Sequence, residues 1–137
     1  MIEATTTAHV NELAENLSMY SEWDAPSKDV ISREVAKAEL CWTGLYNGRV
    51  VCIAGTTRAT LVGGGAYLWM LSAKDLPARA FLKESRKVLK QLLRQYAYLY
   101  GFCDARATKW LAFLGADLKE SVTVENRWLV RFEIWRA

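Results

Sequence analysis

The apolar residues near the start of the chain recur with the spacing of short helices that each bury one side. The stretch EAT predicts a brief strand, and TTAHVNELAENL predicts a helix that Thr6 or Thr7 caps. The positions expected to face inward on this helix are Val10, Leu13, Ala14 and Leu17. Residues 21–27 are typical of a loop. A second short helix follows, capped by Ser27 or Asp29, and its expected inward positions are Val30, Ile31, Val35 and Ala38.

The segment from Glu39 to Leu61 carries the clearest local pattern in the chain. Two apolar runs flank Asn47-Gly48, a dipeptide that adopts the positive φ angles of a tight hairpin turn. Three glycines at 63–65 then precede the run AYLWMLSA. Because they come before a strand and not before a helix, they indicate a flexible connection. The nearly continuous apolar character of AYLWMLSA is typical of a strand covered on both faces.

The second half of the chain alternates between helical and extended patterns. A long helix is predicted from Pro77, whose missing amide is tolerated in a first turn, with Asp75 as its cap. Its expected inner stripe is Phe81, Val88, Leu89, Leu92 and Tyr96. YLYGFCDA predicts the next strand, and ARATKWLAFLGAD predicts a short helix that ends at Gly115. The expected inward positions of that helix are Ala107, Trp110, Leu111 and Leu114.

Two final strands, joined around Glu125-Asn126, complete the order β-α-α-β-β-β-α-β-α-β-β. This order predicts an α/β (α+β) fold with a mixed central sheet of about six to seven strands and about four helices on both faces. No repeat, low-complexity tract or linker interrupts the chain, so we expect a single domain over residues 1–137.

Composition agrees with a globular protein, because 52% of the 137 residues are hydrophobic and 24% are charged. The net charge of +3 is too small to indicate nucleic-acid binding without a local patch. The chain opens without a signal peptide and has no apolar run of the roughly 18 residues that a membrane span needs. These features predict a soluble protein made in the cytosol.

The potential metal ligands are few. The one histidine, His9, falls in the first turn of a predicted helix and is expected to be an ordinary surface residue. No four-ligand cluster is present, so no metal site is predicted. Cys41, Cys52 and Cys103 lack C-x-x-C spacing and are expected to be buried free thiols of a reducing compartment.

The order of elements resembles the GNAT superfamily of acyl-CoA N-acyltransferases, over nearly the whole chain. The most specific pieces are EATTTAHVNELAENL and DARATKWLAFLGA. More narrowly, CWTGLYNGRVVCIAGTT, WMLSA, FLKESRKVLKQLL and YLYGFCDARATKWLAFLGA resemble small GNAT-like proteins of tailed phages. These include the internal virion protein family of short-tailed phages.

The resemblance implies a cofactor loop of Gln/Arg-x-x-Gly-x-Gly/Ala type, whose amides hold the pyrophosphate of coenzyme A. The matching residues, 74–79, contain no glycine, Pro77 removes one amide donor, and Asp75 adds negative charge. This departure predicts that no cofactor binds. If acetyl-CoA does bind, the residues that the resemblance assigns to it are Met70, Leu71, Ser72, Lys74, Ala78 and Arg79.

The resemblance also implies a motif Asn-x-x-Ala-x-x-x-Tyr, in which the tyrosine protonates the leaving thiolate. Here Asp104 replaces the asparagine and Leu111, which has no proton to donate, replaces the tyrosine. The usual glutamate base is missing from AYLWMLSA, and Glu39 is the nearest acid in sequence. Because these motifs are altered, the sequence by itself assigns no catalytic residue. In an active enzyme, Asp104 would orient an amine, and Tyr98, Tyr100 or a water would protonate the thiolate.

Two features of the predicted surface suggest contacts. A basic stripe along the long helix comprises Arg79, Lys83, Arg86, Lys87, Lys90 and Arg94. It is either a solvated face or a contact for an acidic partner or nucleic acid. Trp23, in a loop, and Trp135, near the end of the printed sequence, are the better candidates among six tryptophans for anchoring a partner.

The altered motifs favour a phage virion structural or assembly protein that acts through protein–protein contacts, without acyl transfer. Its partners would be capsid, portal or tail components, and its location the host cytoplasm and then the virion. The alternative is an acetyl-CoA-dependent N-acetyltransferase with a divergent pyrophosphate loop. In that case the first turn of the long helix, with Lys74 and Arg79, would still attract phosphate.

Overall fold

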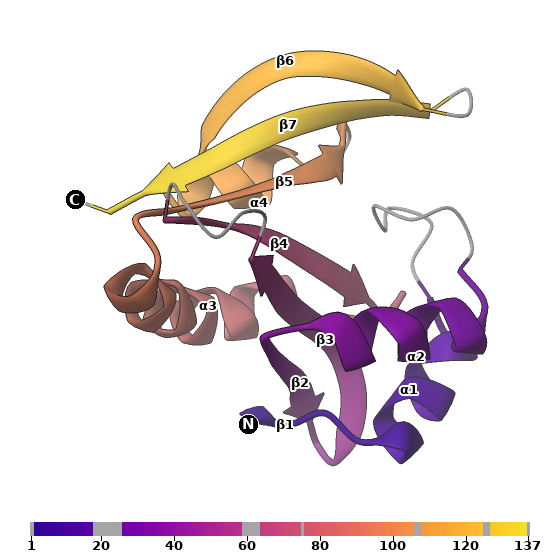
Figure 1. Ribbon diagram of the computed structural model, residues 1–137. Coiled ribbons are helices and arrows are strands. Elements are labelled where there is room, and N and C mark those ends of the chain that lie inside the picture. The colour runs from indigo at the N-terminus through magenta and orange to yellow at the C-terminus, as the bar shows by residue number, and fades with distance from the viewer. Residues whose placement is uncertain are drawn as a thin grey trace. The chain divides into compact units, whose positions relative to one another are not determined.

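Figure 1 shows the computed structural model, which describes residues 2–17, 26–58, 64–74, 76–105, 108–124 and 127–136. The elements follow the predicted order. Their bounds are β1 (Ile2–Ala4), α1 (Thr7–Ala14), α2 (Lys28–Lys37), β2 (Leu40–Tyr46), β3 (Arg49–Arg58), β4 (Gly65–Ser72), α3 (Ala78–Gln95), β5 (Tyr98–Asp104), α4 (Thr108–Phe113), β6 (Asp117–Val124) and β7 (Arg127–Trp135).

The strands form a seven-stranded mixed sheet in the order β1-β2-β3-β4-β5-β7-β6. β4 and β5 are parallel, and β5, β7 and β6 pair in antiparallel fashion, as do β1, β2 and β3. A parallel pair needs a crossover between its strands, and α3 provides it. The predicted fold class is therefore confirmed.

The chain divides into two compact units. The first comprises Met1–Thr57 and Leu68–Pro77, and the second comprises Arg58–Tyr67 and Ala78–Ala137. β4 thus contributes its first three residues to the second unit and the rest to the first. The expectation of a single domain over residues 1–137 stays a prediction.

The core of the first unit is centred on β3. Every residue from Val50 to Thr56 is buried, whereas β4 alternates between buried and half-buried positions from Leu68 to Ser72. The prediction that the AYLWMLSA run is covered on both faces was therefore wrong for its second half. The strand with unbroken burial is β3, which the sequence shows less clearly because it carries Gly55 and Thr56 among its apolar residues.

The hairpin between β2 and β3 turns at Asn47 and Gly48, whose φ angles are +51° and +77°. Both values are positive, as predicted from the Asn-Gly dipeptide. The pairing then shifts register, since Gly44 lies opposite Cys52 while Leu45 lies opposite Val50. One extra residue on β3 creates a bulge there.

The helices of the first unit begin at capping residues that the sequence had narrowed to two choices each. The Thr6 hydroxyl accepts a hydrogen bond from the His9 amide, and the Ser27 hydroxyl accepts one from the Val30 amide. The fully buried contacts of these helices come from Val10, Leu13 and Ile31. α1 ends at Ala14, so Leu17 lies beyond the helix, where it forms an isolated bridge with Ala73.

In the second unit, α3 begins at Ala78, one residue later than predicted, and Pro77 immediately precedes it. Asp75, the expected cap, lies outside the described residues. Phe81 and Leu92 are buried on this helix, and Tyr96 is fully buried just after it. Val88 and Leu89 are only half-buried, so the inner stripe is narrower than the sequence predicted.

α4 ends at Phe113, and Gly115, the predicted stop, follows it with a φ of +83°. The Ala116 amide donates to the Leu111 carbonyl at 3.1 Å, which satisfies a carbonyl at the end of the helix. Leu111 is buried, as expected, whereas Ala107 and the side chain of Trp110 lie outside what the structure describes. The buried face of the β5–β7 ladder carries Leu99, Phe132 and Ile134.

Among the described residues, no helix is both long enough and apolar enough to cross a membrane.

Substitution of Gly55 tests the packing of the first unit. An added Cβ would lie 2.5 Å from Cζ2 of Trp69, a side chain with only 1% of its surface exposed. Because the indole has no room to move, we expect Gly55→Ala to lower the free energy of unfolding by about 1–3 kcal/mol. Denaturant titration measures this loss. Trp69→Phe removes the indole atoms nearest the new methyl group, so the double variant should lose less stability than the sum of the two single variants. Additive losses would contradict the predicted clash.

Candidate functional site

The three catalytic candidates from the sequence all lie on β5, but the strand separates them. Tyr98 is its first residue and Asp104 its last. Six residue steps along a strand span roughly 20 Å. The alternation of a strand places Tyr98, Tyr100 and Asp104 on one face, yet Tyr98 and Asp104 cannot meet at a single reacting atom.

Asp104 is buried and forms an ion pair inside the second unit. Its Oδ2 lies 3.5 Å from Nη2 of Arg127, the first residue of β7, and only 6% of the Asp104 side chain is exposed. The two strands are adjacent, with Asp104 opposite Leu129. The ion pair therefore joins β5 to β7. The expectation that Asp104 would orient a substrate amine has no support in this geometry and stays untested.

Tyr98 is held in an aromatic stack. Its ring lies 4.4 Å from that of Trp135, with 21° between the planes, and the two residues are directly opposite on β5 and β7. The other neighbour of the ring is Gly65, where any Cβ would overlap it. Gly65 therefore serves close packing as the first residue of β4, where the sequence had predicted only a flexible connection.

Trp135 also stabilises the ionised form of the Glu133 carboxyl group. Its indole N–H donates to Glu133 Oε1 at 2.9 Å, and Arg131 forms an ion pair with the other oxygen. The indole hydrogen bond, followed by that from Arg131, holds the pKa of Glu133 below its usual range. Trp135 is nevertheless 54% exposed, so it is available to a partner as predicted; whether it binds one is untested.

Tyr100 lies beside Tyr67, a residue that the sequence did not single out. The ring centroids are 5.7 Å apart, and Arg131 lies over the Tyr100 ring at 5.2 Å. The parallel ladder between β4 and β5 consists of three pairs, Gly65↔Tyr98, Ala66↔Leu99 and Tyr67↔Tyr100. The two phenols thus mark the point at which this ladder ends.

β4 continues beyond the ladder through Leu68–Ser72, which includes three of the residues expected to hold a cofactor. Leu71 is fully buried, while Met70 and Ser72 are half-buried. None of these five residues pairs with β5 in the described structure. This segment belongs to the first unit, whereas Ala78 and Arg79 belong to the second.

The amides after β4 are largely committed to the protein itself. The Ala73 amide donates to the Val51 carbonyl, the Lys74 amide donates to the Asn16 carbonyl, and the Leu76 amide donates to the Ala73 carbonyl. Pro77 has no amide hydrogen. Any further amides for an anion would have to come from the first turn of α3, which begins with Ala78 and Arg79.

All six residues of the predicted basic stripe lie at exposed positions of α3. The geometry of the stripe is therefore confirmed, although no observation tests its partner. Trp23 lies outside the described residues. Trp128, which the sequence analysis did not select, is 64% exposed on β7 and more exposed than Trp135.

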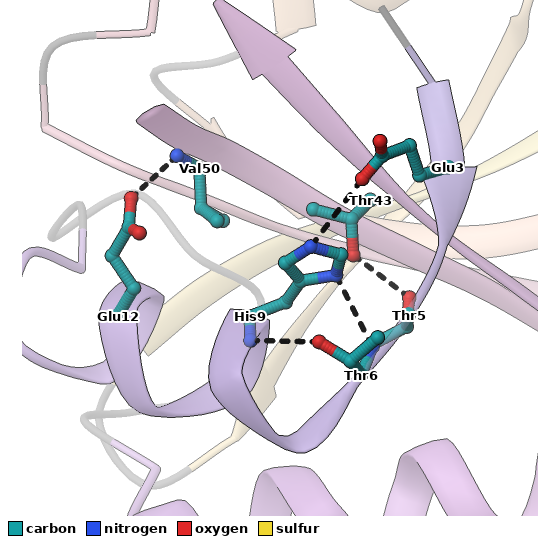
Figure 2. Close-up of polar contacts among 7 residues, drawn as sticks. All are labelled: Glu3, Thr5, Thr6, His9, Glu12, Thr43 and Val50. Carbon is teal, nitrogen blue, oxygen red and sulfur yellow. Dashed lines mark hydrogen bonds and ion pairs between the residues drawn. The ribbon is translucent and has the colours of Figure 1, made fainter. Parts of the chain in front are cut away.

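A polar cluster at the start of the first unit surrounds His9 (Figure 2). His9 Nδ1 accepts a hydrogen bond from the Thr6 amide at 3.1 Å, so the proton of the neutral ring lies on Nε2. Nε2 faces Glu3 Oε2 at 3.6 Å. Only 15% of the side chain is exposed, so the prediction of an ordinary surface histidine was wrong. A histidine here takes the place that glutamate or glutamine usually fills in a capping box.

The rest of this cluster joins α1 to the hairpin strands. Glu12 Oε2 accepts a hydrogen bond from the Val50 amide at 2.5 Å, beside the bulge, and the buried Thr43 hydroxyl donates to Thr5 Oγ1 at 2.9 Å (Figure 2). Glu12 thus pairs with a backbone amide beside the bulge, and Thr5 pairs with a buried hydroxyl group. Because these groups would otherwise lack a partner, the cluster is structural. The described residues contain no group of three or more potential metal ligands.

The three cysteines are free thiols, but only Cys52 is buried; Cys41 and Cys103 are half-buried. Burial raises the pKa of Cys52 to about 11, against a smaller opposing effect of a hydrogen bond with the Gly44 backbone. Burial also raises the pKa of Cys41, which donates to Thr5 Oγ1. Raised pKa values make both thiols poor nucleophiles at neutral pH.

No protein-family model matches the chain, and no curated protein matches it. Solved structures do match the chain. The aminoglycoside acetyltransferase AAC(6')-Ib in complex with coenzyme A is 16% identical with a TM-score of 0.73, over 99% of this chain and 94% of that one. A GNAT-family acetyltransferase from Streptococcus pneumoniae is 12% identical with a TM-score of 0.66, over 100% and 99% of the two chains. The chain has the GNAT fold.

A third match is a spermidine N-acetyltransferase SpeG chimera from Vibrio cholerae and hSSAT, 12% identical with a TM-score of 0.73, over 98% of this chain and 94% of that one. Identities this low show the fold alone. The closer relation to phage internal virion proteins, predicted from the sequence, stays a prediction.

The Asp104–Arg127 pair gives a test of structural against catalytic use. Arg127→Met keeps the aliphatic stem but leaves the Asp104 carboxylate buried without its cation, so we expect the free energy of unfolding to fall by about 3 kcal/mol. Adding Asp104→Asn removes the uncompensated charge and should recover part of that loss. A denaturant-based double-mutant cycle measures the coupling. A coupling energy near zero would show that the pair does not hold β5 to β7.

Cys52 predicts a loss of stability in alkali. An unfolded thiol ionises near pH 9, whereas the folded thiol ionises near pH 11, so unfolding becomes easier between these values because only the unfolded chain releases the proton. A shift of this size corresponds to about 2–3 kcal/mol. Chemical denaturation of wild type and Cys52→Ala from pH 8 to 11 should show a steeper decline for wild type. Val51→Ala truncates the buried side chain next to Cys52 without removing an ionisable group, so its stability should decline with pH as steeply as that of wild type. Equal slopes for Cys52→Ala and wild type would contradict the assignment.

Proposed function

We propose that this chain is an acyl-CoA-dependent N-acetyltransferase with a reduced pyrophosphate grip. The observation that carries the proposal is the short parallel ladder, which ends at Tyr67↔Tyr100 while β4 runs on through Leu68–Ser72. A strand edge that its neighbour does not use can pair with an extended ligand that carries amide groups. Pantetheine is such a ligand.

The similar structures support the same cofactor class. One was solved with coenzyme A, and the names of three of them give an aminoglycoside, a ribosomal-protein alanine and spermidine as acceptors. All three acceptors are amines. We therefore infer that the acceptor of this chain is also an amine.

The residues of the chain fit coenzyme A in part. The N-terminal end of α3 carries the positive end of the helix dipole, and the exposed Arg79 side chain lies in this first turn. Lys74 adds an exposed positive charge after β4. With the amides of Ala73, Lys74 and Leu76 already donating within the protein, we expect weak phosphate binding compared with a glycine-rich loop.

When bound, acetyl-CoA supplies an acyl group activated as a thioester. In the transfer, the acceptor amine forms a C–N bond and loses one proton, the C–S bond breaks, and the leaving thiolate takes up one proton. Leu111 cannot provide that proton, and Tyr98 is held against Trp135 and Gly65. Tyr100, at the end of the ladder, is the phenol that we propose as the donor.

A binding role without acyl transfer is the second candidate, favoured by the committed amides and by the buried leucine at position 111. The capsid, portal or tail partners expected from the sequence belong to this candidate. Its virion location has no structural observation behind it.

Acetyl-CoA binding decides between the candidates. We expect a rise in melting temperature with millimolar acetyl-CoA, since a ligand at 100 times its Kd adds about 2.7 kcal/mol. Arg79→Glu should weaken binding at least tenfold, because it reverses the charge beside the first turn of α3. Lys87→Glu makes the same change at another exposed position of α3 and should bind as wild type does.

Release of free thiol in the presence of polyamines, aminoglycosides and N-terminal peptides measures transfer in the same samples. Tyr100→Phe should lower kcat at least tenfold with little change in KM. Absence of any thermal shift at millimolar acetyl-CoA would remove the acetyltransferase proposal and leave the binding role.

A further inference from the structure

The second unit contains a groove of about 600 Å³ formed by α3, the residue after α4 and the end of β7. Four of its lining residues are cations: Arg86, Lys90, Arg94 and Arg136. No carboxylate lines it, and none of the four forms an ion pair among the described residues. The groove is therefore a concentration of positive charge that the described part of the chain does not neutralise.

The floor of the groove is aliphatic. Its remaining lining residues are Leu89, Leu93, Leu114 and Ile134. The three leucines are half-buried, so a ligand in the groove would remove apolar surface from water. Leu89, which the sequence placed on the inner stripe of α3, is part of this floor instead.

Two of the cations are fixed in place. Arg86 donates from Nη2 to the Phe113 carbonyl at 3.1 Å, and Arg136 donates from Nε to the Leu93 carbonyl at 2.6 Å. Each guanidinium has five N–H groups, so these bonds leave further donors directed outward. A pre-positioned guanidinium loses little freedom when it binds a carboxylate.

The groove also divides the basic stripe of α3. Arg86, Lys90 and Arg94 line it, whereas Arg79, Lys83 and Lys87 do not. A face that was only solvated would not need an apolar floor between its charges. It would also not need a fourth cation, Arg136, which follows β7. Four cations without an ion pair among the described residues coincide here with four aliphatic side chains, and this combination indicates a binding surface.

We propose that this groove binds an acidic amphipathic segment of a partner protein, with aliphatic anchors over the leucines and carboxylates at the four cations. An amphipathic helix in an apolar groove is a common recognition mode. Nucleic acid fits less well, because the described lining residues include no aromatic side chain to stack a base, and an aliphatic floor offers nothing to a phosphate backbone. The proposal is independent of acetyl-CoA binding.

The test uses a fluorescent 16-residue helical peptide with leucine along one face and glutamate elsewhere, measured by anisotropy with the full chain. We expect micromolar binding at 50 mM NaCl and at least tenfold weaker binding at 300 mM. A peptide with serine in place of leucine keeps its charge and should bind at least tenfold more weakly. Equal binding of the two peptides would overturn the role of the floor.

The variants separate the groove from the rest of the helix. Arg94→Glu and Lys90→Glu should each reduce affinity at least fivefold, and Leu93→Gln should do so without changing charge. Lys87→Glu reverses a charge on the same helix but outside the groove, so its affinity for the peptide should stay within twofold of that of wild type. If Lys87→Glu weakens binding as much as Arg94→Glu, only general attraction is at work and the proposal fails.

Competition identifies other occupants. A 20-nucleotide single-stranded DNA and vesicles of anionic phospholipid are added to the peptide complex in turn. We expect little displacement by either at equal charge concentration. Full displacement by DNA or by vesicles, or a lack of peptide binding at 50 mM NaCl, would overturn the assignment to an acidic protein segment.

Discussion

The short parallel ladder between β4 and β5 is the constraint on which the possible chemistry of this chain depends. Backbone donors and acceptors in a sheet need partners, and a ladder of only three pairs leaves the second half of β4 without β5 as its partner. On the side that faces β5, the Leu68–Ser72 segment is left to a ligand or to water, and the proposed acetyl transfer depends on a ligand pairing there. The phenols of Tyr67 and Tyr100 lie where this choice begins.

The amides that follow β4 donate hydrogen bonds within the protein itself. Amides that would face a pyrophosphate in a glycine-rich loop instead bond to Val51, Asn16 and Ala73. These internal bonds tie the end of β4 to β3 and to the segment after α1. Stability of the strand end and anion binding therefore compete for the same donors.

Local patterns in the sequence were sufficient for the order of the elements, because caps, turns and periodicity act within a few residues. Thr6, Ser27, Asn47-Gly48 and Gly115 each act as the sequence predicts. Contacts set by strand register were not predictable, since they join positions distant in the chain. Tyr67 meets Tyr100 only because β4 and β5 align in that register, and Arg127 meets Asp104 for the same kind of reason. The division of the basic stripe likewise depends on Leu114 and Arg136, which no helical pattern could bring to α3.

β6 has a consequence for how the chain can associate. It is the outer strand on its side of the sheet, and it carries Lys119 and Glu120 at exposed positions with an irregularity between Leu118 and Ser121. Charges and a break in regular pairing at an outer strand discourage the addition of a foreign strand. Sheet extension into fibres or domain-swapped dimers is therefore disfavoured at this border, and recognition of other molecules is left to side chains.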